Sequence, residues 1–322
     1  MLRVENFENF GSFFESLSES LLPFKARLEG KDLGFGEAID PLKSPFAEGS
    51  RWSMSWCCFA SPSSGTPRHH RRELTCMKQE KAPCVILPGF GNKSDDYVEF
   101  VRTLEGRGHR CYVVPVKRSD WWKTFKGLRT RNYWTGKLEP NMVLDWYFNS
   151  VRNTMQEAEE NESDGFNIIG HSAGGWLGRI YLHERIPVQK NQLVKTLITL
   201  GTPHLPPPKN TFDQTRGLLT YVNTRCDNNH RKEVSYICVG GKSLQGKKWR
   251  EGKFEEWFAY QSYGPVCGVG ATWGDGITPL ESAFLEDAER IVIEGALHSP
   301  VSAPSSWYGS EGLIDKWIHH LQ

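Results

Sequence analysis

The stretch of residues 166–175 reads FNIIGHSAGG and decides the fold class of this 322-residue chain. FNII is a short apolar run typical of a buried strand, whereas the residues after Ser172 have the apolar spacing of a helix. Ser172 therefore lies at a tight strand-to-helix turn, where Gly170 and Gly174 let the neighbouring backbone pass without Cβ clashes. G-x-S-x-G alone arises by accident in about one chain in ten of this size, but the strand-before, helix-after context is far more specific. The pattern predicts that Ser172 is an exposed nucleophile.

Short apolar runs alternate with helical segments from Ala82 onward, as expected for a mostly parallel sheet with crossover helices on both faces. The expected strands are residues 84–87, 111–116, 166–169, 194–200, 234–239 and 290–294. The expected helices are near residues 97–104, 142–159 and 173–184, with a C-terminal helix over 313–321. This is an α/β architecture without an internal repeat.

A serine nucleophile also needs two N–H donors for the oxyanion that forms in acyl transfer. One donor should come from the residue after the nucleophile, Ala173, and the other from the loop after an earlier strand. The strand at 84–87 runs into PGFG, in which Gly89 and Gly91 allow the Phe90 N–H to approach a substrate carbonyl. The same letters would suit a plain strand-terminating turn, but the position before the first crossover helix favours an oxyanion loop.

The acid and the base of such a site follow the nucleophile in the order Ser, Asp or Glu, His. WGDGITP at 273–279 supplies Asp275 in a glycine-flanked loop, with Glu281 and Asp287 as rival acids. LHSP at 297–300 places His298 just beyond the last expected strand. His204, which follows the strand after the nucleophile, is the competing base.

Three insertions interrupt the alternation, at about residues 118–140, 204–232 and 242–272. Between 117 and 137 there is one acid, Asp120, against seven basic residues: Lys117, Arg118, Lys123, Lys126, Arg129, Arg131 and Lys137. The same segment holds the aromatic residues Trp121, Trp122, Phe125, Tyr133 and Trp134. The third insertion, where a cap over the site would sit, holds Trp249, Phe254, Trp257, Phe258, Tyr260 and Tyr263. Aromatic rings with basic neighbours predict peripheral membrane contact, the alternative being that they only pack the cap onto the sheet.

The motifs PGFG, GHSAGGW, LGTPH, GDGITP and LHSP together resemble the lipase-like branch of the α/β-hydrolase superfamily, over about residues 82–320. In particular, they look like the GPI inositol-deacylase-like hydrolases of plants and cyanobacteria. The resemblance implies an α/β-hydrolase fold with aromatic-rich cap insertions, carboxylic-ester hydrolysis on lipid-like substrates, and a chloroplast location. Many relatives begin the oxyanion loop with His-Gly, whereas this chain has Pro88-Gly89.

We therefore expect a serine hydrolase in which Ser172, His298 and Asp275 cleave the ester of a lipid or other acyl substrate through an acyl-enzyme. An acyltransferase or a thioesterase would use the same three residues, and a catalytically silent binding protein is a further alternative. No metal or organic cofactor is expected, since the sequence lacks HExxH, Cys/His ligand spacing and GxGxxG after a strand.

The composition separates residues 1–80 from the expected hydrolase domain at 81–322. The N-terminal extension begins with an amphipathic pattern and continues into SPSSGTPRHHRR, which is typical of a linker or a transit-like segment. We expect a chloroplast or otherwise cytoplasmic protein rather than a secreted one. A formal net charge of +1 predicts no nucleic-acid partner, and the sequence does not indicate the oligomeric state.

Overall fold

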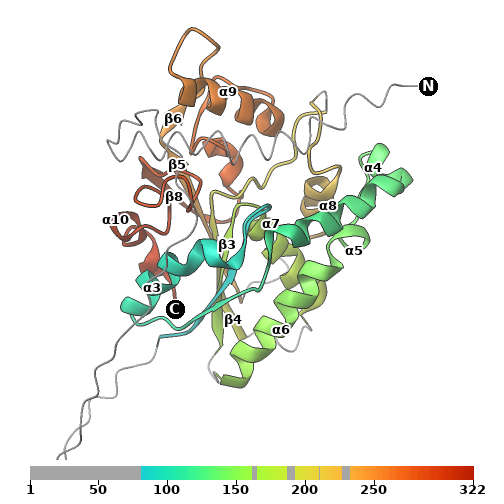
Figure 1. The fold of residues 1–322 in the computed structure, drawn as a ribbon. Coiled ribbons are helices and arrows are strands. Elements are labelled where there is room, and N and C mark those ends of the chain that lie inside the picture. The colour runs from blue at the N-terminus through green and yellow to red at the C-terminus, as the bar shows by residue number, and fades with distance from the viewer. Residues whose placement is uncertain (1–80, 162–164, 187–192, 210, 227–232) are drawn as a thin grey trace, which may run out of the picture. The chain divides into compact units, whose positions relative to one another are not determined.

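The computed structural model describes residues 81–161, 165–186, 193–209, 211–226 and 233–322, which fall in one compact unit (Figure 1). The helix and linker expected within residues 1–80 lie outside these ranges. Six parallel strands form the sheet in the order β2-β1-β3-β4-β5-β8. Their bounds are β1 Cys84–Leu87, β2 Cys111–Val113, β3 Phe166–His171, β4 Val194–Leu200, β5 Ser235–Lys242 and β8 Glu289–Glu294. The expected parallel sheet is confirmed.

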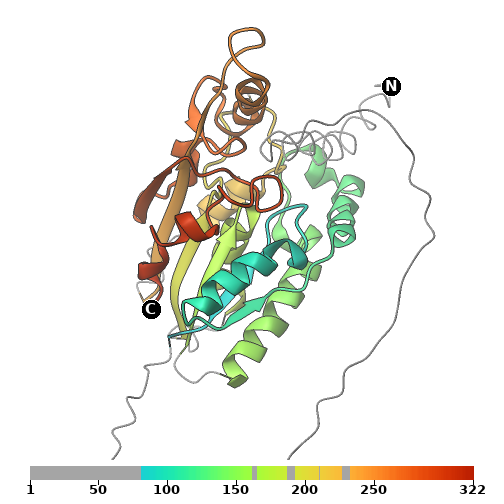
Figure 2. The same ribbon diagram turned by 60° about the vertical axis from the view of Figure 1, so that its left-hand side comes forward.

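Two apolar cores lie on the two faces of this sheet, because successive side chains of a strand point to opposite faces. In β1, Val85 and Leu87 belong to the core that includes residues of α6 (Asp145–Asn161) and α7 (Ala173–Ile180). Cys84 and Ile86 belong to the other core, with residues of α3 (Val98–Gly106) and the C-terminal segment. Helices therefore cover both faces, as Figures 1 and 2 show.

The connections contain the remaining helices. Between β2 and α6 the chain forms η3 (Arg118–Arg129), α4 (Arg131–Trp134) and α5 (Pro140–Val143), whose proline occupies the first turn, where it costs no hydrogen bond. α7 continues as the π-helical turn η4 (Tyr181–Arg185), and α8 (Leu218–Arg225) precedes β5. After β5 come the short antiparallel pair β6 (Leu244–Gln245) and β7 (Trp273–Gly274), with α9 (Phe254–Cys267) between them.

Two elements differ from expectation. β2 ends at Val113 rather than 116, and Pro115 provides a reason because it has no N–H to donate to a ladder. The continuous C-terminal helix is instead α10 (Glu311–Ile314) followed by η8 (Ile318–His320). Here Trp317 N bonds to the carbonyl of Ile314, an i→i+3 turn, and Trp317 Nε1 donates to the carbonyl of Tyr308 at 2.9 Å. Packing of the indole thus overrides the helical spacing.

Within the described residues, none of the helices combines the length and apolarity needed to cross a bilayer. The five cysteines in those ranges are free thiols: Cys84, Cys111, Cys226, Cys238 and Cys267.

Candidate active site

Ser172 lies between β3 and α7 with φ 52° and ψ −124°, a backbone conformation that L-residues rarely adopt. A Cβ at Gly170 would come within 2.5 Å of Gly175 Cα, and one at Gly174 within 2.1 Å of Leu87 O. The glycines are therefore required for close approach of the backbone around the turn. Ser172 N also donates to the carbonyl of Leu200 at 2.9 Å, which ties the turn to the end of β4.

Asp275 and His298 are in direct contact beyond the ends of β7 and β8. His298 Nδ1 lies 2.7 Å from Asp275 Oδ2, and His298 N donates to the Asp275 carbonyl at 3.0 Å. Because a carboxylate only accepts hydrogen bonds, Nδ1 is the donor in this pair, and the contact with Asp275 does not occupy Nε2. Nε2 is the nitrogen that a general base needs.

The carboxylate of Asp275 is buried, and both of its oxygens accept hydrogen bonds. Oδ2 also accepts the Tyr308 hydroxyl at 2.7 Å, and Oδ1 accepts the N–H groups of Ile277 at 3.0 Å and Thr278 at 2.6 Å. Burial alone would raise the pKa of Asp275, but the charge and hydrogen bond of His298, with those of Tyr308 and Thr278, lower the pKa below its usual value. Asp275 is therefore held as an anion facing His298.

Tyr308 was not among the residues predicted from the sequence. Its hydroxyl accepts the Gly241 N–H at 2.9 Å and donates its own proton to Asp275. Burial raises the pKa of Tyr308 well above its usual value, so the hydroxyl stays a donor. In the same region the Tyr263 hydroxyl of α9 accepts the Gly276 N–H at 2.8 Å, which anchors α9 to the loop that carries Asp275.

His171 connects Ser172 to the loop of His298. Its Nε2 lies 2.9 Å from the His298 carbonyl, an acceptor, so this nitrogen carries the ring proton. Burial, with repulsion from His298, lowers the pKa of His171 to about 3, so the ring is neutral and Nδ1 is an acceptor. The Tyr97 hydroxyl is the donor to Nδ1 at 2.8 Å, and it accepts the Gly89 N–H at 3.1 Å. One chain of hydrogen bonds thus joins Gly89, Tyr97, His171 and the His298 backbone.

The expected oxyanion loop lies against the nucleophile. A Cβ at Gly89 would come within 2.7 Å of Ser172 Cβ, and Gly91 has φ +78°. Tyr147 donates to the Pro88 carbonyl at 2.9 Å and fixes the start of the loop. Phe90 follows Gly89, and Ala173 is the first residue of α7, where backbone N–H groups favour negative charge.

His171, which directly precedes Ser172, is hydrogen-bonded to the backbone of His298. In the described ranges no hydrogen bond joins Ser172 Oγ to His298 Nε2. Catalytic contacts are often loose before substrate binds. The rival residues lie elsewhere. His204 is buried with Nε2 3.1 Å from Thr199 Oγ1, and Glu281 and Asp287 are exposed.

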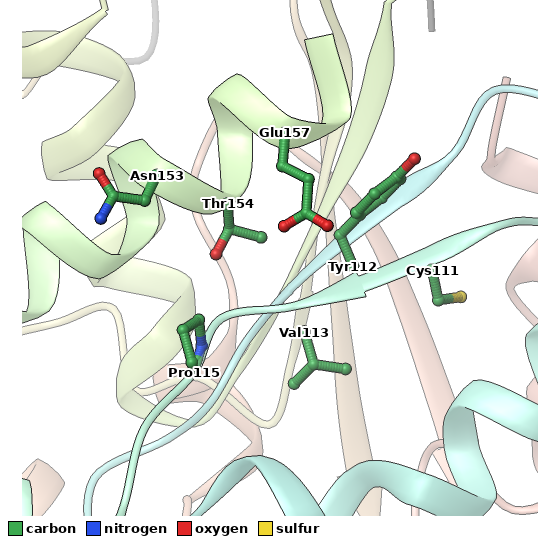
Figure 3. A pocket seen from close by; sticks show the side chains of 7 residues that line it. All are labelled: Cys111, Tyr112, Val113, Pro115, Asn153, Thr154 and Glu157. Carbon is green, nitrogen blue, oxygen red and sulfur yellow. The ribbon is translucent and has the colours of Figure 1, made fainter. Parts of the chain in front are cut away.

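A cavity of about 350 Å³ lies away from this constellation, between the edge strand β2 and α6 (Figure 3). Its lining residues are Cys111, Tyr112, Val113, Pro115, Asn153, Thr154 and Glu157. None of the candidate catalytic residues lines it. Among the described residues, no group of three or more His, Cys, Asp or Glu side chains is placed to hold a metal ion.

Solved structures share this fold at low identity. The mature lipase BlEst2 of Bacillus licheniformis matches with a TM-score of 0.50 and 14% identity, over 76% of this chain and 93% of that one. The metagenomic carboxyl esterase MGS0156 matches with a TM-score of 0.49 and 9% identity, over 75% of each chain. A soluble variant of the Saccharomyces cerevisiae monoglyceride lipase matches at 0.43 and 12%, over 75% of this chain and 88% of that one. The likeness to BlEst2, together with the parallel six-stranded sheet, confirms the expected α/β-hydrolase fold.

A comparison with curated protein sequences returned no match. The family model described as palmitoyl protein thioesterase matches residues 83–261, more than half of the chain. The match includes Ser172 and the loop at Gly89, whereas Asp275 and His298 lie beyond it. The chain is a carboxylic ester hydrolase, and it belongs to the palmitoyl protein thioesterase family.

Proposed function

We propose that the protein hydrolyses long-chain acyl esters or thioesters, with Ser172 as nucleophile, His298 as general base and Asp275 as the residue that orients the base. The observation that carries this proposal is the 2.7 Å bond between His298 Nδ1 and Asp275 Oδ2. It leaves Nε2 as the proton acceptor in a histidine whose backbone is tied to the elbow of Ser172.

The chemistry proceeds in two half-reactions. Ser172 Oγ attacks the acyl carbonyl and gives its proton to His298 Nε2, while the Ala173 and Phe90 N–H groups stabilise the oxyanion. Collapse of the tetrahedral intermediate breaks the bond to the leaving alcohol or thiol, which takes the proton from His298. A water molecule, deprotonated by His298, then attacks the acyl-Ser172 ester. The bond between the acyl carbon and Ser172 Oγ breaks, Oγ takes the proton back from His298, and the carboxylic acid is released.

Two observations support a lipid-like acyl group. The family model is named for a palmitoyl thioesterase, and the connections after β1, β2 and β5 carry exposed aromatic side chains, among them Phe90, Trp122 and Trp273. A peripheral contact with the membrane that holds the substrate is part of this proposal. A thioester is the favoured substrate, with a thiol as the leaving group, because the matching family model is described as a thioesterase. An oxygen ester, and transfer to an alcohol or thiol instead of water, are the other candidates.

The experiment is a kinetic comparison of matched acyl thioesters and oxygen esters with short and long chains. The proposal predicts that kcat/KM rises with chain length and that His298→Ala loses turnover of every substrate. Ser235→Ala is the matched control, since Ser235 is exposed at the opposite, amino end of β5. Equal turnover by His298→Ala and wild type would contradict the catalytic assignment, and a preference for short chains would contradict the substrate class.

A further inference from the structure

Among the described residues, the four most exposed tryptophans lie in connections that follow the carboxyl ends of sheet strands. Trp122 (65% exposed) and Trp134 (58%) lie after β2, and Trp249 (60%) and Trp273 (41%) lie after β5. Ser172 lies at the same ends, after β3. In Figures 1 and 2, α4 and α9 both lie beyond the end of the sheet to which the strands point. These four exposed tryptophans therefore lie on the side of the molecule that carries Ser172.

Residues 117–137, here called the basic aromatic segment, pack directly on the oxyanion loop. Trp121 Nε1 donates to the Asn92 carbonyl at 2.8 Å, and Arg118 Nε donates to the Gly91 carbonyl at 3.1 Å. The Phe90 and Trp121 rings lie 4.9 Å apart. A Cβ at Gly89 would come within 2.7 Å of Ser172 Cβ, so the segment packs on the loop that lies beside the nucleophile.

One tryptophan of this segment is buried, and the other two are exposed. Trp121 is 4% exposed, and its ring lies 5.1 Å from that of Trp146 and 5.5 Å from that of Tyr147. Trp122 and Trp134 keep more than half of their surface exposed. A bilayer interface would cover such amphipathic rings at the level of the headgroups.

The positive charge of the basic aromatic segment favours a bilayer that contains anionic lipids. Its seven basic residues against one acid give a formal charge of +6, compared with +1 for the whole chain. All seven basic side chains are exposed. The acid, Asp120, accepts from Lys123 at 2.7 Å and from the Lys117 N–H at 2.8 Å. Each basic residue near an anionic membrane strengthens binding about fivefold.

We infer that the basic aromatic segment docks the protein peripherally on an anionic membrane, with Trp122 and Trp134 among the headgroups. This inference deepens the proposed function and rests on it, because docking would bring the acyl chain of a membrane-held substrate to Ser172. The surface supplies both attractions that such a membrane recognises, exposed amphipathic rings and a local excess of cations.

The test is co-sedimentation of the full chain with vesicles of phosphatidylcholine alone or mixed with phosphatidylserine, at low and high salt. We expect binding to the anionic vesicles that weakens with salt. Trp122→Ala with Trp134→Ala, and separately Lys126→Glu with Arg129→Glu, should each lower binding at least tenfold with unchanged thermal unfolding. The matched control, Lys81→Glu with Lys316→Glu, changes exposed lysines outside the segment by the same charge and should bind like wild type.

Ser172→Ala separates docking from catalysis, since it should bind vesicles like wild type while losing hydrolysis. If wild type binds anionic vesicles yet cleaves no acyl substrate, the proposed function fails and docking stands. Docking is overturned if wild type does not bind anionic vesicles, binds neutral ones equally well, or keeps its affinity in both double variants.

Discussion

The ring of His171 donates its Nε2 proton to the backbone carbonyl of His298 at 2.9 Å, so the residue beside the candidate nucleophile holds the loop of the candidate base. The other ring nitrogen accepts from Tyr97, which accepts from Gly89. The nucleophile elbow, the oxyanion loop and the base are thus linked by one chain of buried hydrogen bonds.

We expect His171→Phe to lower kcat about tenfold to a hundredfold with little change in KM, because a lost buried hydrogen bond costs about 1–3 kcal/mol. His171→Gln, which can still donate and accept, should recover part of kcat. Steady-state kinetics on a soluble ester measure both variants. If both keep the wild-type kcat, or if KM alone changes, His171 does not position the base.

Acid should destabilise the fold through its buried neutral histidines. Burial lowers the pKa of His171 to about 3 and that of His204 well below its ordinary value of 6.5. The unfolded chain therefore binds more protons below pH 6.5, and stability present above that pH is lost as the pH falls. The slope is about 1.4 kcal/mol per pH unit for each such histidine.

Urea unfolding at pH values from about 7 to about 5 measures this loss. His204→Gln removes one of the two groups, and it should show a shallower dependence of the free energy of unfolding on pH than wild type. A wild-type free energy that stays constant over this range would contradict the neutral, buried state of both rings.

Asp275→Asn should lower kcat by on the order of 10⁴, because an amide cannot hold the required tautomer of His298. His298→Ala should be comparably inactive, and the double variant little worse, since these residues act as a unit. His204→Ala is the control histidine. Full inactivation by His204→Ala with an active His298→Ala would show that the base was wrongly chosen.

The strands were the part of the fold most readable from sequence. β1 and β4 have the expected bounds, because strands buried on both faces of a parallel sheet are continuous apolar runs. The turn at Ser172 could be predicted because close backbone contacts around it leave no room for a Cβ, and glycines at those positions are visible in the sequence. Asp275 and His298 were named as acid and base from their order along the chain after Ser172, and the structure brings the two side chains together.

Two supporting residues were not readable from local pattern. Tyr97 lies 74 residues before His171, and Tyr308 lies 33 residues after Asp275, so only the folded chain brings each pair together. The similarity to GPI inositol-deacylase-like hydrolases and the chloroplast location stay predictions, the latter because the transit-like segment lies outside the described residues.

Labelling with a fluorophosphonate, followed by mass spectrometry of the modified peptide, tests the central claim that Ser172 is the nucleophile. The account predicts that wild type and Ser235→Ala are labelled on Ser172, and that Ser172→Ala is folded, unlabelled and inactive. Modification of a different residue, or Ser172→Ala with about half or more of the wild-type turnover, would contradict it.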